Sequence, residues 1–412
     1  MKHSGEGEPA MMTVAAIAAE YNPFHNGHAY QIAQTRAAGA THIVAVMSGN
    51  FTQRGSPAFA EKRARSRSAL SGGADLIVEL PLPYAMATAQ RFALGAVSIA
   101  EGMGCVDVLS FGSESGYLSI LQAAAEAVDS PAVLARQSEL LGQGITFARA
   151  RQQAVSELCG DEIADMLASP NDNLAVEYIR QMHRIGSRIP PFAVPRTGTR
   201  HDSQEASGEI ASASFLRALI RSGGVEAAAG LVPEKCLTAM REAFREGEAP
   251  FDEAALEPVV FGVLRRMTPA ELSRLPDLSE GLENRIYAAI RQAAGLGEVH
   301  TLAKSKRYTA ARIRRVVTSA FLGLDDSYGA GDTGAPYLRI LGFNERGREI
   351  LTRMKQTARL PVSDSLAYLR RLGGRAAAFA ELEARSTDLY RLGLPKVGPC
   401  GFDFTTQSIR LL

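Results

Sequence analysis

The sequence predicts an α/β protein, with a doubly wound parallel sheet in its first half and a mainly helical second domain. In the first half, short β-rich apolar runs alternate with segments of helical length, as at 14–19 and 27–38. This alternation indicates a parallel sheet, because parallel neighbours must be joined by long crossovers, usually helices. Beyond about residue 230 the apolar spacing is helical almost throughout. Ligands of such sheets bind where the strands end, so motifs at those ends are candidates for a site.

The expected elements follow one another in a regular order. Apolar β-rich runs predict strands at 14–19, 41–47, 75–80, 106–111 and 192–194. Helical spacing predicts helices at 27–38, 59–71, 88–102 and 210–222, with 118–186 largely helical. Glycine and proline pairs separate several of these elements. The expected units are a disordered lead at 1–11, an α/β domain at 12–230 and a mainly helical domain at 231–412.

Composition limits the class of protein. The chain has 412 residues, a formal net charge of +1 and 46% hydrophobic residues, as in an ordinary globular protein. Its four cysteines are not at metal-ligand spacing, so we expect no metal site, no disulfide framework and a cytoplasmic location. No apolar run reaches the ~18 residues of a membrane span. Because the chain is nearly neutral, any nucleic acid must bind through a local basic patch.

The most informative motif is His25-Asn26-Gly27-His28, at the turn between the first expected strand and its helix. Gly27 lets a ligand approach the backbone, and a helix N-terminus attracts phosphate through its unpaired N–H groups and dipole. Two imidazoles there can donate hydrogen bonds to the phosphorus centre of an adenylyl transfer, where charge builds up in the transition state. A chance pair of turn histidines is the alternative, since a four-residue string alone is weak evidence.

A second motif runs from Ile210 to Arg217 and reads Ile-Ala-Ser-Ala-Ser-Phe-Leu-Arg. Ser212 or Ser214 can cap a helix and donate to a phosphate oxygen, and Arg217 can neutralise the outer phosphates of a nucleotide. A plain helix cap followed by a solvated arginine would explain this motif alone. In combination with the two histidines, phosphate binding is the better explanation.

These two motifs, in this order, resemble those of the HIGH-type nucleotidyltransferase superfamily. More closely, the chain resembles the bacterial tRNA(Met) cytidine acetate ligase family, in order from Met12 to about Leu394. The resembling segments are 19–28, 47–55, 73–81, 111–114, 169–172, 210–217, 304–309 and 335–342. The resemblance implies a Rossmann-like nucleotidyltransferase sheet and an ATP-dependent ligase that activates acetate as acetyl-adenylate. The acetyl group would then pass to the N4 amine of the wobble cytidine of elongator tRNA(Met).

The motifs and the resemblance together define an expected nucleotide site. His25 and His28 are the expected catalytic residues. The expected ATP contacts are Ala18, Ala19, Glu20, Tyr21, Asn22, Pro23, Phe24, His25, Asn26, Gly27, His28, Gly112, Asn171, Arg196, Thr197, Ser212, Ser214 and Arg217. Among these, Gly112, Asn171, Arg196 and Thr197 are implied by the resemblance, and a helix cap is the alternative for Asn171 or Asp172. Mg²⁺ is expected with ATP, since it bridges phosphates while using few protein ligands.

The second domain contains a basic segment at 304–315 that has no acidic residue and is predicted to be helical. A solvated helix face is the ordinary explanation of such a charge run. Its single sign in a nearly neutral chain favours contact with an RNA backbone. The expected tRNA contacts are Lys304, Lys306, Arg307, Arg312 and Arg315. A second basic stretch, Lys62, Arg63, Arg65 and Arg67, is expected near the mouth of the site, so that both patches cradle the tRNA.

Several roles and two other functions stay open. Gln53 and Arg54 suit a carboxylate, a tRNA phosphate or an ordinary surface loop; Glu79 is a site candidate, and no general base for the cytidine amine is identified. An adenylyltransferase acting on a small phosphorylated acceptor would share the ATP motifs without needing the basic segment. A noncatalytic RNA-binding protein on the same fold is disfavoured by the presence of both motifs. Neither a membrane nor DNA is an expected partner.

Overall fold

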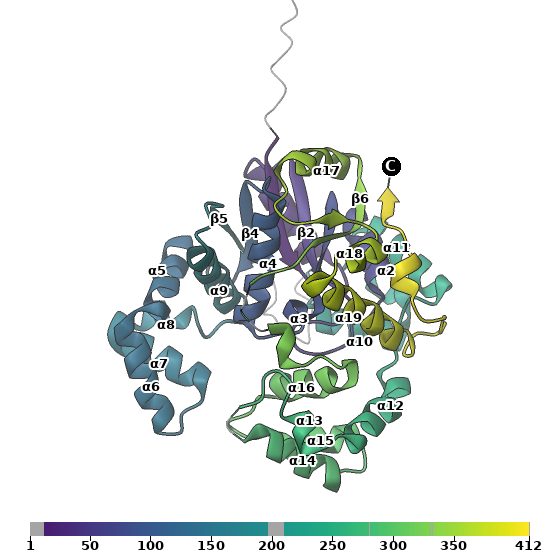
Figure 1. The fold of residues 1–412 in the computed structure, drawn as a ribbon. Helices are drawn as coiled ribbons and strands as arrows, with labels where there is room; N and C mark the ends of the chain where they lie inside the picture. Colours follow the sequence, from purple (N-terminus) through teal and green to yellow (C-terminus); the bar gives the residue numbers. More distant parts are fainter. Residues whose placement is uncertain (1–11, 197–209, 280, 330, 332, 412) are drawn as a thin grey trace, which may run out of the picture.

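The sheet lies at the centre of the molecule. A computed structural model describes residues 12–196, 210–279, 281–329, 331 and 333–411, so the expected lead at 1–11 lies outside the described residues. Eight strands are described in one sheet, in the order β5-β4-β1-β2-β3-β6-β7, with β8 beside β6 (Figure 1). Strands β1 to β5 run parallel to one another, and β6 is antiparallel to β3. The predicted doubly wound, mostly parallel sheet is therefore confirmed.

The predicted strands of the first half are present, with ends that shift by at most two residues. The strands are β1 (Val14–Ala19), β2 (His42–Ser48), β3 (Leu76–Leu80), β4 (Val108–Ser113), β5 (Pro191–Pro195), β6 (Leu338–Asn344), β7 (Val362–Ser363) and β8 (Ile409–Leu411). The helices of the first half are α1 (Asn26–Ala37), α2 (Lys62–Ser71), α3 (Leu82–Ala85), α4 (Ala89–Met103), α5 (Leu118–Asp129), α6 (Pro131–Gly142), α7 (Phe147–Cys159), α8 (Asp161–Asp165), α9 (Pro170–Ile185) and α10 (Ala213–Gly223).

The central strands are buried on both faces, because side chains alternate across a strand. In β1, Val14 and Ala16 belong to the core that includes residues of α4 and α9. Ala15 and Ile17 belong instead to the core that includes residues of α1 and α2. This two-sided burial explains why the strands are continuous apolar runs in the sequence. It leaves the strand ends as the places where polar groups meet.

The second half is mainly helical, as predicted, but it also supplies β6, β7 and β8, which the sequence pattern did not predict. Its helices are α11 (Glu234–Glu246), α12 (Glu253–Arg266), α13 (Pro269–Leu272), α14 (Leu282–Gln292), α15 (Leu296–Ala303), α16 (Ala310–Leu322), α17 (Glu345–Thr357), α18 (Leu366–Arg371), α19 (Gly374–Arg391) and α20 (Phe402–Thr405). The division into two domains at residue 230 stays a prediction.

Helices α12 to α16 gather in a lobe below the sheet in Figure 1, separate from the lobe formed by α5 to α8. The lower lobe has its own apolar core, and that core also includes Phe51 and Leu82. These two residues follow the carboxyl ends of β2 and β3. The lobe therefore packs against the edge of the sheet at which parallel folds bind ligands.

Candidate active site

The predicted histidine motif lies at the turn from β1 to α1. The backbone of Tyr21 has a φ of 46°, the Asn22–Pro23 peptide is cis, and Asn22 and Pro23 form a turn. The side-chain oxygen of Asn22 accepts a hydrogen bond of 2.7 Å from the Phe59 N–H. Its main-chain carbonyl accepts one of 2.8 Å from Arg217 Nη1. The turn is thus held by contacts to α10 and to the segment before α2.

His25 and His28 form a stacked pair at the start of α1. Their ring centroids lie 3.7 Å apart. His25 Nδ1 accepts a hydrogen bond of 3.1 Å from the Gly27 N–H, and His28 Nδ1 accepts one of 3.2 Å from the His25 N–H. Because Nδ1 is the acceptor in both rings, the proton of each neutral ring is on Nε2. Each imidazole is thereby fixed as an Nε2–H donor, which is the form needed to stabilise a phosphate transition state.

The environment of His28 keeps it neutral. Burial lowers the pKa of His28 well below its ordinary value, and the neighbouring His25 and Arg196 lower it further. A neutral ring retains the Nδ1 lone pair that accepts from the His25 N–H. The donor arrangement is therefore maintained at physiological pH.

Gly27 is required by the histidine pair. A Cβ atom at this position would lie 2.9 Å from His25 Cε1 and 3.1 Å from His25 Nδ1. It would also lie 3.8 Å from Ile210 Cγ2. The structure therefore brings the start of the second motif, which is distant in sequence, against the histidine turn.

The second motif begins α10 beside this turn. Ser212 is its N-cap and accepts a hydrogen bond of 3.1 Å from the Phe215 N–H. Arg217 donates to the Asn22 carbonyl and, over 3.0 Å, to Ser214 Oγ. The structure thus confirms that the two motifs lie together, while their contacts with ATP stay predictions.

A second group of predicted residues lies at the carboxyl ends of β4 and β5. The Arg196 N–H donates to the Ser113 carbonyl over 2.9 Å. A Cβ atom at Gly112 would lie 3.6 Å from Arg196 Cγ and 3.9 Å from Gln31 Oε1, so this glycine leaves space between α1 and Arg196. The absence of a side chain allows a ligand to approach the main chain closely at this position. The predicted contact Thr197 lies outside the described residues.

Asn171 lies in the first turn of α9, and Glu114 holds it there. Asn171 Nδ2 donates to Glu114 Oε1 over 2.5 Å, and the Asp172 N–H donates to Glu114 Oε2 over 2.9 Å. Asp172 itself accepts from the Ser115 N–H over 3.1 Å. The alternative that Asn171 or Asp172 caps α9 is therefore wrong, because Ser169 occupies the N-cap position and Glu114 satisfies the helix N–H groups.

The loop after β2 adjoins the turn through Glu20. Glu20 Oε1 accepts a hydrogen bond of 2.7 Å from the Gln53 N–H. Gln53 and Arg54 therefore lie near the histidine turn, as their position after a strand predicts. Their functional roles stay open.

The basic segment of the second half is only partly helical, so the prediction of one helix over 304–315 is wrong. Thr309 caps α16, which begins at Ala310, and accepts from the Arg312 N–H over 3.3 Å. Lys304, Lys306 and Arg307 are exposed in the preceding connection. Arg315 is only 9% exposed and forms an ion pair of 2.5 Å with Asp277. The surface that the segment offers to RNA is therefore smaller than predicted.

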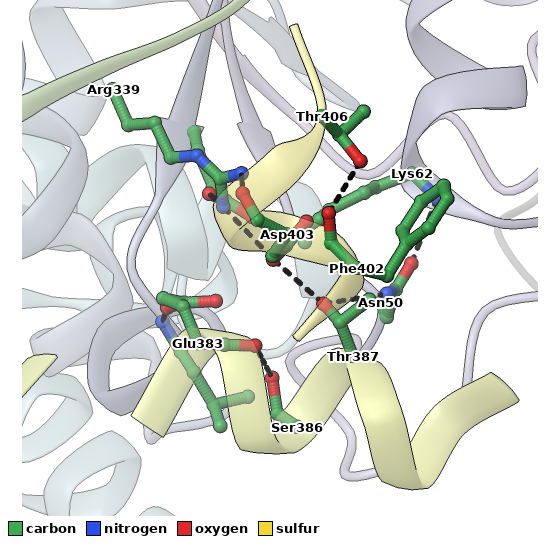
Figure 2. A network of polar contacts seen from close by, with 12 residues as sticks. Asn50, Lys62, Arg339, Glu383, Ser386, Thr387, Phe402, Asp403 and Thr406 are labelled. Atoms are coloured by element: carbon green, nitrogen blue, oxygen red, sulfur yellow. Dashed lines mark hydrogen bonds and ion pairs between the residues drawn. The ribbon is translucent and has the colours of Figure 1, made fainter. Parts of the chain in front are cut away.

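The second basic stretch is largely not a surface patch. Lys62 is 1% exposed and Arg65 is 2% exposed, so the expectation that they cradle RNA is wrong. Lys62 Nζ contacts Glu79 Oε1 at 2.7 Å and Asp403 Oδ2 at 2.5 Å (Figure 2). Glu79, a candidate site residue by sequence, is thus engaged in a buried ion-pair network. Basic residues of one helix therefore differ in burial. The sequence pattern alone does not specify which of them are buried.

Comparison with known proteins defines the class to which this site belongs. Residues 12–400 match the HIGH nucleotidyl transferase family, so the chain belongs to that family. Within it, the chain is 37% identical to the tRNA(Met) cytidine acetate ligase of Thermoanaerobacter sp. (strain X514) over 404 residues, which cover 97% of this chain and 100% of the relative. It is 34% identical to that of Acetivibrio thermocellus over 414 residues, with coverages of 97% and 100%. The chain is therefore a member of the tRNA(Met) cytidine acetate ligase family.

Solved structures agree with this assignment. The fold matches the apo crystal structure of Thermotoga maritima TmcAL with a TM-score of 0.92 and 32% identity, covering 97% of this chain and 100% of that one. It matches the same protein bound with alpha-thio ATP with a TM-score of 0.90 and 31% identity, covering 97% and 99%. Among the described helices of this chain, none has the length and apolar character that a membrane span requires.

Proposed function

We propose that this protein is an ATP-dependent ligase that activates acetate as acetyl-adenylate and acetylates the N4 amine of the wobble cytidine of elongator tRNA(Met). The observation that carries the proposal is the pair of stacked histidines at the start of α1, with the Ser-x-Ser-x-x-Arg motif of α10 against the same turn. Membership of the ligase family over nearly the full chain supports the choice of acceptor.

In the first step, a carboxylate oxygen of acetate bonds to the α-phosphorus of ATP. The bond from that phosphorus to the bridging oxygen breaks, and pyrophosphate leaves with the electron pair. His25 and His28 donate through Nε2–H to the oxygens on which negative charge grows. Ser212, Ser214 and Arg217 hold the leaving phosphates, because hydroxyls and a guanidinium match their charge and geometry.

In the second step, the cytidine amine attacks the acetyl carbonyl and loses a proton to solvent. The bond from the carbonyl carbon to the phosphate oxygen breaks, and AMP leaves with the electron pair. The base must be removed from its neighbours to reach the anhydride, and the single-stranded anticodon loop allows this at low cost. In this proposal Lys304, Lys306 and Arg307, which are exposed just before α16, hold the RNA backbone. The close approach of α16 to Gly55, in the loop after β2, supports a position near the site. This reaction places the protein in the cytoplasm, where its tRNA is found.

Mg²⁺ accompanies ATP in this proposal. Within the described residues, no group of three or more His, Cys, Asp or Glu side chains is arranged to hold a metal ion. The proposal assigns Mg²⁺ no protein ligand, because in such sites it is usually held by phosphate oxygens and water. When bound, it neutralises phosphate charge.

The test is acetate-dependent ATP–pyrophosphate exchange, followed by transfer of labelled acetate to tRNA(Met). We expect exchange with acetate, weaker exchange with larger carboxylates, and transfer only to an elongator tRNA(Met) with an intact wobble cytidine. Exchange that requires a phosphorylated small molecule instead of a carboxylate would favour the adenylyltransferase alternative. RNA binding without any exchange would favour the noncatalytic alternative.

A further inference from the structure

We propose that Arg65, a buried arginine of α2 that the motif analysis placed on the surface, is a positioning residue for adenylyl transfer, holding the histidine turn in its active geometry. This inference rests on the proposed function, because it assigns a role within the same reaction. Arg65 does not reach the phosphates itself. It acts through the main chain that precedes His25.

The guanidinium of Arg65 joins three segments of main chain. Nη1 donates to the Glu20 carbonyl over 2.5 Å, and Nε donates to the Ala60 carbonyl over 3.0 Å. Nη2 donates to the carbonyls of Ser48, over 3.1 Å, and Gly49. Glu20 begins the turn that leads to His25, and Ser48 and Gly49 begin the loop after β2. One side chain thus fixes the carboxyl ends of two adjacent parallel strands.

The chemistry of this contact is specific to arginine. A cation that is 2% exposed must have its donors satisfied, or its burial costs several kcal/mol. Here each hydrogen bond described for the guanidinium is accepted by a main-chain carbonyl. A planar fork of five N–H groups can bond to carbonyls on several sides at once, whereas a lysine ammonium cannot span them. The geometry of the turn therefore depends on this side chain.

Other buried cations nearby serve a different purpose. Arg339 of β6 is 3% exposed, and its Nη1 contacts Glu79 Oε2 at 2.7 Å and Asp403 Oδ2 at 3.0 Å. Figure 2 shows Arg339, Lys62 and Asp403 converging, and Thr387 Oγ1 donates to Asp403 over 2.8 Å. This network joins the C-terminal helices to the sheet and makes no described contact with the histidine turn. Arg339 is therefore a matched control, with similar burial and the same charge but carboxylate partners.

The experiment compares Arg65→Lys and Arg65→Met with Arg339→Lys. In the Arg65 variants we expect kcat for acetate-dependent pyrophosphate exchange to fall at least tenfold, more in Arg65→Met than in Arg65→Lys, with KM for ATP within threefold of the parent. This split follows because the histidines act on the transition state and contribute less to binding of ATP. Arg339→Lys should lose thermal stability but keep kcat for each folded molecule. Equal loss of kcat in Arg65→Lys and Arg339→Lys, or no loss in either, would overturn the role.

A second readout does not depend on the reaction. The Cε1–H signals of His25 and His28 in ¹H–¹³C spectra report the arrangement of the ring pair. We expect both signals to shift in Arg65→Lys and to stay in place in Arg339→Lys. Unchanged histidine signals in a folded Arg65→Lys variant would overturn the proposal. If the parent protein shows no exchange with acetate, the proposed function fails, and the histidine spectra still decide the role of Arg65.

Discussion

His28 differs from a solvent-exposed histidine in its hydrogen bonding and in its pKa. Its Nδ1 is occupied by the His25 N–H, and burial lowers its pKa well below the ordinary value. An unfolded chain has an ordinary histidine with a pKa of about 6.5, which therefore takes up a proton before folded His28 does. Stability from this residue is present above about pH 6.5 and is lost as the pH falls below it. Because His28 stays neutral between pH 7 and 8, its titration should not change the rate of adenylate formation in that range.

Replacement of His28 by Ala tests its role in the reaction. We expect adenylate formation to fall by about 2 to 4 kcal/mol, roughly 30- to 1000-fold, as for loss of one preorganised donor. Folding should persist, because the ring lies at the start of α1 and not in the apolar core. His183→Ala is the control, since His183 is exposed on α9. Pyrophosphate exchange at the parental rate in folded His28→Ala would remove His28 from the mechanism.

Glu61 provides a separate prediction about stability. Its carboxylate is fully buried without a described hydrogen-bond partner, and burial together with Glu248 and Asp403 raises its pKa to about 7. The folded state thus binds a proton that the unfolded state releases near pH 4.5, so stability from this group is lost as the pH rises toward 7. Glu61→Gln should therefore stabilise the protein, with an advantage that grows by about 2 kcal/mol from pH 5 to pH 8. Urea unfolding at both pH values measures it. Glu246→Gln, at a more exposed position, should show no such trend.

The loop from Gly49 to Pro57 is the element that joins the nucleotide turn to the lower lobe. At one end, the Gln53 N–H donates to Glu20. At the other, the Gly55 carbonyl accepts a hydrogen bond of 2.7 Å from Thr318 Oγ1 of α16. The same helix begins within the basic segment, at Ala310. The loop therefore contacts both the histidine turn and the helix that carries part of the basic segment.

Gly55→Ala tests this connection. Gly55 has a φ of +80°, and a Cβ atom there would lie 2.6 Å from Arg315 N and 2.8 Å from Arg315 Cα. Gly144 is a matched control, because its φ is +82° but nothing lies within 4 Å of its Cβ position. Both variants should lose about 1 to 2 kcal/mol from left-handed strain, and Gly55→Ala should lose about 1 to 3 kcal/mol more from the clash with α16. In Gly55→Ala, but not in the control variant, transfer of acetate to tRNA should fall more than acetate-dependent pyrophosphate exchange. If both variants lost the same amount of stability, the clash with α16 would not contribute to the effect of Gly55→Ala.

The strands and motifs that depend on local sequence were predictable, and those that depend on distant partners were not. Buried strands such as β1 are continuous apolar runs, so the sequence indicates them directly. Strand β6 was missed because Arg339 interrupts its apolar run, and the partners that balance its charge are Glu79, 260 residues away, and Asp403. The histidine motif is local and was found. Arg65 was assigned to the surface because neighbouring basic residues of α2 look alike until the fold places them.

Across the whole molecule, the residues predicted to contact the nucleotide and those predicted to contact RNA lie on different elements. The predicted nucleotide contacts gather at the ends of β1, β4 and β5, whereas the lower lobe packs over the ends of β2 and β3 (Figure 1). With a net charge of +1, the chain has no general attraction for RNA. Binding of tRNA should therefore depend on where the exposed cations lie, and the basic segment is the surface that we propose for it.

Simultaneous replacement of Lys304, Lys306 and Arg307 by Ala tests that surface, because these exposed cations precede α16. Acetate-dependent exchange should be unchanged, while acetylation of tRNA falls steeply. The slope of log affinity against log salt should flatten by about 0.7 to 0.9 for each phosphate that the variant no longer neutralises. The control replaces Arg346, Arg348 and Lys355, which are exposed on α17 at the opposite end of the molecule (Figure 1). Anisotropy with tRNA(Met) across a salt series measures both variants. If both bind tRNA with the parental slope, RNA is held elsewhere, whereas equal flattening in both would indicate a response to total charge alone.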